Sequence, residues 1–114
     1  MLFRSLHDSN ALLFASELIG SLTVLLINNQ GGGIFENLPV ANLPEFEKCF
    51  ATPQCCNFAK LCAAYSLEYL LLEREKELIS YIANPPPRGI RVIEIRTDRK
   101  ADRKVRQKLL SLGI

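Results

Sequence analysis

The stretch of sequence that decides the fold is Leu22-Thr23-Val24-Leu25-Leu26-Ile27-Asn28-Asn29-Gln30-Gly31-Gly32-Gly33. Its first six residues form an apolar run of strand length without alternation, a pattern typical of a strand that helices cover on both faces. Two asparagines end the run and three glycines follow. Glycine lets the backbone approach a ligand closely, and open parallel sheets bind ligands beyond the carboxyl ends of their strands. The stretch therefore predicts a buried strand followed by a ligand-binding loop, with a flexible turn as the alternative.

The rest of the chain alternates between predicted helices and strands. Apolar periodicity and breakers predict helices over residues 11–19, 57–65 and 73–83, and strands over residues 67–72 and 90–96. A last helix, capped by Thr97 or Asp98, runs to about residue 112. This order predicts an α/β fold with a mainly parallel sheet flanked by helices. Three strands leave bare edges, so the unit resembles part of a larger domain or one that pairs with another chain.

Composition narrows the class of protein. The chain has 114 residues, which fits one small domain and excludes a two-domain enzyme. Its 14 basic and 12 acidic residues nearly balance, so no overall field indicates nucleic acid or a membrane surface as a partner. No apolar run approaches the roughly 18 residues that cross a bilayer, and the first residues lack a secretory signal. We therefore expect a cytoplasmic protein.

Two further groups of residues have structural interpretations. The cysteines at positions 49, 55, 56 and 62 include no C-x2-C pair, and the only histidine is remote from them, so reduced and partly buried thiols are predicted. In the last helix, Arg99, Arg103 and Arg106 share one face, whereas Val105, Leu109 and Leu112 share another. This pattern predicts a solvated amphipathic helix and not an RNA-binding one.

A family resemblance rests on residues 22–41, which are similar to the second half of the thiamine-diphosphate signature. The form of the signature is that of the 2-succinyl-5-enolpyruvyl-6-hydroxy-3-cyclohexene-1-carboxylate synthases, the MenD family. Further segments resemble the same family: residues 6–12, 50–54, 58–62 and 90–102. The Gly-Gly-Gly-Ile-Phe-Glu-Asn-Leu-Pro run and the Thr-Asp-Arg ending disfavour other thiamine-diphosphate enzymes. The resemblance covers most of the chain and corresponds to the C-terminal portion of a full-length synthase.

The resemblance implies that residues 1–114 are the C-terminal part of a thiamine-diphosphate-binding (pyrophosphate) domain. The family's enzymes use thiamine diphosphate and Mg²⁺ to join decarboxylated 2-oxoglutarate to isochorismate in menaquinone or phylloquinone biosynthesis. By this resemblance Asn29 gives a side-chain oxygen to Mg²⁺ and Gly31 gives its backbone carbonyl. The implied cofactor-binding residues are Asn29, Gly31, Gly32, Ile34, Phe35 and Leu38.

One departure from the family pattern lies at the start of the chain, where the slot of the magnesium aspartate falls on Leu2. Protein sites for Mg²⁺ on phosphates normally keep a carboxylate, so the remaining pair of neutral oxygens is weak. No residue matches a catalytic role either. We therefore expect the isolated chain to be inactive and to need other domains or chains of a full-length synthase. The alternative is a non-catalytic interaction module that pairs with itself, as a homo-oligomer, or with a full-length synthase.

Overall fold

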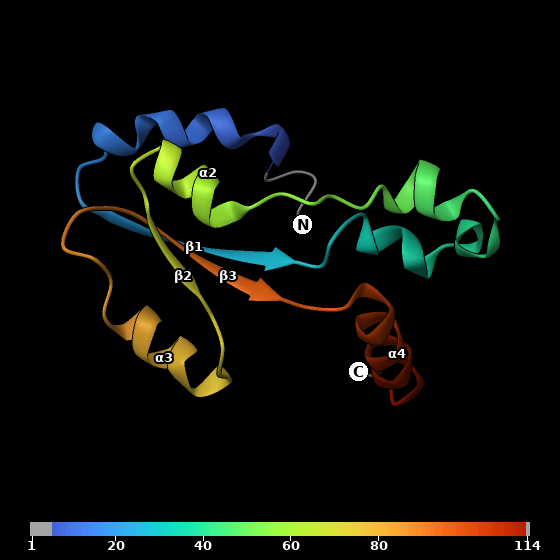
Figure 1. Cartoon of the computed structure of the whole chain (residues 1–114). Coiled ribbons are helices and arrows are strands. Elements are labelled where there is room, and N and C mark those ends of the chain that lie inside the picture. The colour runs from blue at the N-terminus through green and yellow to red at the C-terminus, as the bar shows by residue number, and fades with distance from the viewer. Residues whose placement is uncertain (1–5, 114) are drawn as a thin grey trace.

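The computed structural model describes residues 6–113 and contains one three-stranded parallel sheet (Figure 1). Its strands are β1 (Ser21–Asn28), β2 (Glu68–Leu71) and β3 (Gly89–Arg96), in the spatial order β1-β3-β2. β3 is the central strand and pairs in parallel with both neighbours, with Val24 opposite Val92 on one side. The predicted α/β class with a parallel sheet is confirmed.

Three α-helices follow the predicted order: α2 (Phe58–Ala64), α3 (Glu75–Ala83) and α4 (Arg99–Ser111). Asn57 and Asp98 cap α2 and α4, because their side chains accept hydrogen bonds from the free amides of the first turn. The Asp98 cap confirms one of the two predicted alternatives. Within the described part of the chain, no helix combines the length and the apolar character that crossing a membrane requires.

The first predicted helix differs from the expectation. Residues 11–19 do not form an α-helix, and the structure instead has a 3-10 helix, η1 (Ser9–Ser16). The side chain of its N-cap residue Asp8 accepts no hydrogen bond from the helix amides, and its carboxylate lies 2.9 Å from the Nδ1 of His7. A short helix without a cap is marginal as a regular α-helix.

The segment between β1 and α2 forms three short turns beyond the carboxyl ends of the strands (Figure 1). They are the 3-10 turns η2 (Gly33–Asn37) and η3 (Pro39–Asn42) and the π-helical turn η4 (Glu47–Ala51). α4 lies at the same end of the sheet (Figure 1). The predicted loop region is therefore a small folded cap over the carboxyl rim.

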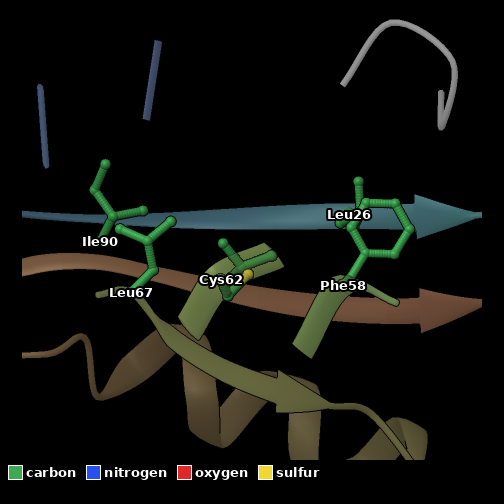
Figure 2. Close-up of a cluster of buried hydrophobic side chains, with 6 residues drawn as sticks. Leu26, Phe58, Cys62, Leu67 and Ile90 are labelled. Carbon is green, nitrogen blue, oxygen red and sulfur yellow. The ribbon is translucent and has the colours of Figure 1, made fainter. Parts of the chain in front are cut away.

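The main core lies between the sheet and the layer that α2 and η1 form. Leu26, Phe58, Cys62, Leu67 and Ile90 converge there (Figure 2), and Val92 completes the buried cluster. α3 lies on the opposite side of the sheet (Figure 1).

The two faces of β1 are not equally covered, which corrects the expectation of a strand buried on both faces. Leu26 is 4% exposed, but Leu25 and Ile27 on the other face are 42% and 39% exposed. α3 is held beside β3, because Arg91 donates hydrogen bonds to the carbonyls of Tyr81 (3.3 Å) and Asn84 (2.7 Å). This face of β1 is therefore only partly covered among the described residues.

The cysteines fall into two classes. Cys62 is buried in the core and Cys56 is half-buried, whereas Cys49 and Cys55 are exposed. Burial, with a smaller contribution from the charge of Glu94, raises the pKa of the Cys56 and Cys62 thiols. The prediction of partly buried thiols holds for Cys56 and Cys62 and is wrong for the other two.

Replacing Ile93 tests the central position of β3. Ile93 is fully buried, so Ile93→Ala should lower the free energy of unfolding by about 3 kcal/mol through lost burial and a residual cavity. Ile79→Ala is the matched control, because Ile79 on α3 is 76% exposed and its loss should change stability by less than about 0.5 kcal/mol. Urea denaturation followed by circular dichroism measures both. Equal losses for the two variants would contradict this packing.

Candidate functional site

A buried carboxylate joins the three strands near their carboxyl ends. Glu94, on central β3, is 2% exposed. Its Oε1 accepts hydrogen bonds from Asn28 Nδ2 of β1 (2.6 Å) and Arg96 Nε (3.0 Å), and its Oε2 accepts one from the Tyr69 hydroxyl of β2. We call Glu94, Asn28, Tyr69 and Arg96 the Glu94 junction.

The junction holds its carboxylate in the charged form. Burial alone would raise the pKa of Glu94, but the hydrogen bonds from Tyr69, Asn28 and Arg96 outweigh it, so this pKa lies below its usual value. Burial and the hydrogen bond to Glu94 raise the pKa of Tyr69 to about 12. At neutral pH the Glu94 carboxylate is therefore ionised. It accepts hydrogen bonds from the neutral phenol of Tyr69, the amide of Asn28 and the guanidinium of Arg96.

Asn28 connects this junction to the glycine-rich turn. Its Oδ1 accepts a hydrogen bond from the Gln30 amide at 3.1 Å, and Gln30 has a left-handed φ of 57°. Beyond it, the Gly32 amide donates to the Ala51 carbonyl at 2.7 Å. A Cβ at Gly31 would lie 2.4 Å from the same carbonyl oxygen, so only glycine fits there. The turn is thus fixed at both ends, by Asn28 and by η4, and is not a flexible loop.

The two predicted metal ligands lie within this turn. Asn29 is half-buried, and its Oδ1 is 3.4 Å from the Gly31 amide, a long hydrogen bond that leaves the oxygen available. The Gly31 carbonyl accepts from the Gly33 amide at 3.0 Å and keeps a second lone pair. Both residues can therefore offer oxygen ligands at the carboxyl rim of the sheet.

These donors do not by themselves complete a magnesium site. Both are neutral, and the nearby Glu94 carboxylate is already bound by three donors. Residues 6–113 contain no cluster of three histidine, cysteine or acidic side chains that could hold a metal. Leu2, at the slot of the family's magnesium aspartate, lies outside the described residues.

The other predicted cofactor-binding residues separate into two groups. Ile34 is 53% exposed and borders the same cavity as Asn29, so the structure brings these two together. Phe35 packs edge-on against Phe50 with ring centroids 6.0 Å apart, and Leu38 is 47% exposed. Neither of these lines that cavity. The amide of Gly32, also in the predicted set, is occupied by Ala51.

Ion pairs anchor α4 to the cap over the rim. Arg99 Nη1 lies 2.6 Å from Oε1 of Glu36, which is 4% exposed, and Arg99 Nη2 bonds Glu47. Hydrogen bonding and charge from Arg99, with help from Lys100, hold the pKa of Glu47 below its usual value despite partial desolvation. Arg99 therefore binds η2 and η4 at once.

This anchoring corrects the prediction for the first turns of α4. Arg99 and Arg103, expected in solvent, face the cap and are 12% and 30% exposed, whereas Arg106 is exposed as predicted. The apolar face is exposed instead, with Val105 at 60%, Leu109 at 44% and Leu112 at 64%. A buried carboxylate needs a cationic partner, so Glu36 attracts the arginine face where the described residues give the apolar face no surface to pack on.

Two buried acids that organise the carboxyl rim were not predicted from the sequence. Glu94 had a usable signal, since it interrupts an apolar strand and Arg96 follows on the same face of that strand. Glu36 lies in a turn and had none.

The pH dependence of stability in the variant Glu94→Gln tests whether the carboxylate of the junction is charged. The folded pKa of Glu94 lies below its unfolded value of about 4.3, so the stabilisation is complete above that pH and is lost as pH falls through the folded pKa. At pH 7 the variant should be less stable by about 2 kcal/mol, and by pH 2 the difference should shrink. Urea denaturation at pH 7, 4 and 2 measures this, with Glu73→Gln at an exposed position as the control. A difference that stays constant over this range would contradict the charged junction.

The comparisons with known proteins agree with the resemblance in the sequence. No family model matches the chain. The chain is 52% identical over 103 residues to the 2-succinyl-5-enolpyruvyl-6-hydroxy-3-cyclohexene-1-carboxylate synthase of Synechococcus sp. (strain JA-3-3Ab), covering 90% of the chain and 17% of that protein. The synthases of the same name from Trichodesmium erythraeum (strain IMS101) and Trichormus variabilis (strain ATCC 29413 / PCC 7937) are 49% and 46% identical. These matches cover 85% and 93% of the chain and 17% and 18% of those proteins. Over most of its length the chain is therefore a homologue of one segment of the 2-succinyl-5-enolpyruvyl-6-hydroxy-3-cyclohexene-1-carboxylate synthases, a segment that spans less than a fifth of their length.

Proposed function

We propose that the chain supplies the turn that holds Mg²⁺ and the diphosphate of thiamine diphosphate in a synthase of this family. The main observation in support of this proposal is the position of the turn at the carboxyl ends of the strands. Asn29 and Gly31 offer oxygen donors at the carboxyl rim of a parallel sheet, where such sheets bind ligands. The similarity to proteins that bear the synthase name supports it. Residues 1–114 are then part of a thiamine-diphosphate-binding domain.

Each residue of the turn has a defined task in this proposal. Asn29 and Gly31 are the metal ligands, and the Glu94 junction holds Asn28 so that Asn29 is oriented toward the rim. Ile34 borders the ligand cavity, and Gly32, Phe35 and Leu38 shape the turn around it. When bound, the cofactor supplies the carbanion chemistry that joins decarboxylated 2-oxoglutarate to isochorismate, a step towards menaquinone or phylloquinone.

We further propose that this activity requires other domains or chains of a full-length synthase, in the cytoplasm. The described donors are two neutral oxygens, and the face of β1 with Leu25 and Ile27 is uncovered. The chain spans about a sixth of the length of its relatives. By itself it is proposed to be inactive, because a weak metal site without a positioned base cannot carry the reaction.

The exposed apolar surface favours a second candidate, a non-catalytic interaction module. Leu25, Ile27, Val105 and Leu110 are all more than a third exposed. Such surface supports pairing with a second copy of the chain or with a full-length synthase. Light scattering after size exclusion tests this candidate, and a monomer that captures no synthase in a pull-down argues against it.

Calorimetry on the purified chain tests the metal site. Thiamine diphosphate with Mg²⁺ should show no saturable binding at micromolar concentration, because no carboxylate completes the ligand set among the described residues. One-to-one binding at micromolar concentration would overturn the proposal that the isolated chain is incomplete.

Complementation tests the proposed function itself. The chain is co-expressed with the Synechococcus synthase from which the homologous segment has been removed, and product formation from 2-oxoglutarate and isochorismate is measured. Activity should appear, and Asn29→Ala should lower it at least about tenfold by removing a metal ligand. Asn42→Ala, at an exposed position in η3, is the control and should leave it unchanged. Equal activities of the two variants would remove Asn29 from the site.

A further inference from the structure

A cavity of about 320 Å³ lies between η2 and the first turns of α4. Arg103 and Arg106 line it from α4, Ile34 and Asn37 from η2, and Asn29 from the end of the sheet. We call it the arginine cavity. Its volume is at the lower end for ligand pockets, which suits a small molecule or one group of a larger one.

The charges around the arginine cavity are not all neutralised. Arg99, at its edge, is bound by Glu36 and Glu47. Arg103 Nη1 lies 3.9 Å from Glu36 Oε2, which is beyond hydrogen-bond distance. Arg106 forms no ion pair with any of residues 6–113.

The acids near the cavity leave the charge of Arg106 without a partner among the described residues. Of these residues, Asp102 is the only carboxylate that lines the cavity, and its Oδ2 accepts a hydrogen bond from the Thr97 hydroxyl at 2.7 Å. Arg103 shares Glu36 with Arg99, and Arg106 has no acidic partner within residues 6–113. The amides of Asn29 and Asn37 add neutral donors on the facing wall.

α4 concentrates positive charge beside the cavity. The helix carries six basic residues and one acidic residue in a chain whose net charge is only +2. The ion pair of Arg99 with Glu36 holds the first turn of the helix against η2, and Arg103 and Arg106 then lie at the wall of the cavity. Arg106 is exposed, so a ligand can reach it from solvent.

We propose that the arginine cavity binds a small oxyanion, a phosphate or carboxylate group, with Arg103 and Arg106 as direct ligands and without a metal. The planar guanidinium fork matches two oxygens of such a group, and the asparagine amides supply further donors. The site lies in the cavity that the proposed function uses and in part rests on that function, but it depends neither on Mg²⁺ nor on Asn29 as a metal ligand. The oxyanion can belong to a diphosphate or to a dicarboxylate substrate, which share this chemistry.

Titration of the full chain with two probes in EDTA tests the site. Inorganic pyrophosphate and succinate are each titrated by calorimetry at low ionic strength. The variants are Arg103→Gln and Arg106→Gln, and Lys108→Gln is the control, because it removes the same charge from the same helix outside the cavity. Circular dichroism verifies that each variant is folded.

At least one probe should bind, and Arg106→Gln should weaken its binding at least about fivefold, since a charge-assisted hydrogen bond is lost. Lys108→Gln should change it less than about twofold, and binding should weaken as salt rises because the cavity is open to solvent. Tighter binding of pyrophosphate assigns the site to a phosphate, and tighter binding of succinate assigns it to a carboxylate.

Three results would overturn the proposal: neither probe binds, Lys108→Gln weakens binding as much as Arg106→Gln does, or binding requires Mg²⁺. Failure of the proposed function has a different signature. In that case thiamine diphosphate with Mg²⁺ finds no site even in the complemented synthase, while pyrophosphate or succinate binds the chain in EDTA.

Discussion

The constraint on which the carboxyl rim depends is the burial of the Glu94 carboxylate. A charge inside a small sheet is tolerated only where donors surround it, and the donors here come from all three strands. Asn28 must therefore end opposite Arg96, which is the register that the β1–β3 pairing has. Because the same Asn28 side chain also accepts from Gln30, the start of the glycine-rich turn is fixed by a residue 66 positions away.

A second buried carboxylate organises the other side of the rim. Glu36 binds Arg99 and so brings α4 against η2, with Arg99 and Arg103 inward and the apolar residues outward. Each of the two acids therefore determines the position of a different element at the rim. Glu94 sets where the turn begins, and Glu36 sets which face of α4 lies over it. The charge of the rim follows from this arrangement, since the arginine cavity lies between the two anchored elements.

Local signals predicted the order of elements, because periodicity, caps such as Asp98 and the glycine run all act within a few residues. The predictions that were wrong concerned contacts between residues far apart in the sequence. The exposure of Leu25 and the orientation of α4 depend on which surface each face packs against. The sequence pattern is the same whichever face is buried. In the site, the resemblance implied six cofactor-binding residues without their relative positions. The structure places Asn29 and Ile34 beside one cavity, whereas Phe35 packs on Phe50, a contact between segments that only the folded cap brings together.

The incomplete ligand set and the uncovered strand are related by geometry. β1 pairs only with β3 among the described residues, so its outer edge is open, and it ends at Asn28, next to Asn29. A polypeptide that added a parallel strand to this edge would end its own strand at the same rim, since the carboxyl ends of parallel strands lie together. A carboxylate directly after that strand would lie beside Asn29 and Gly31. If the proposed function holds, covering the edge of β1 and completing the metal site would then be one event.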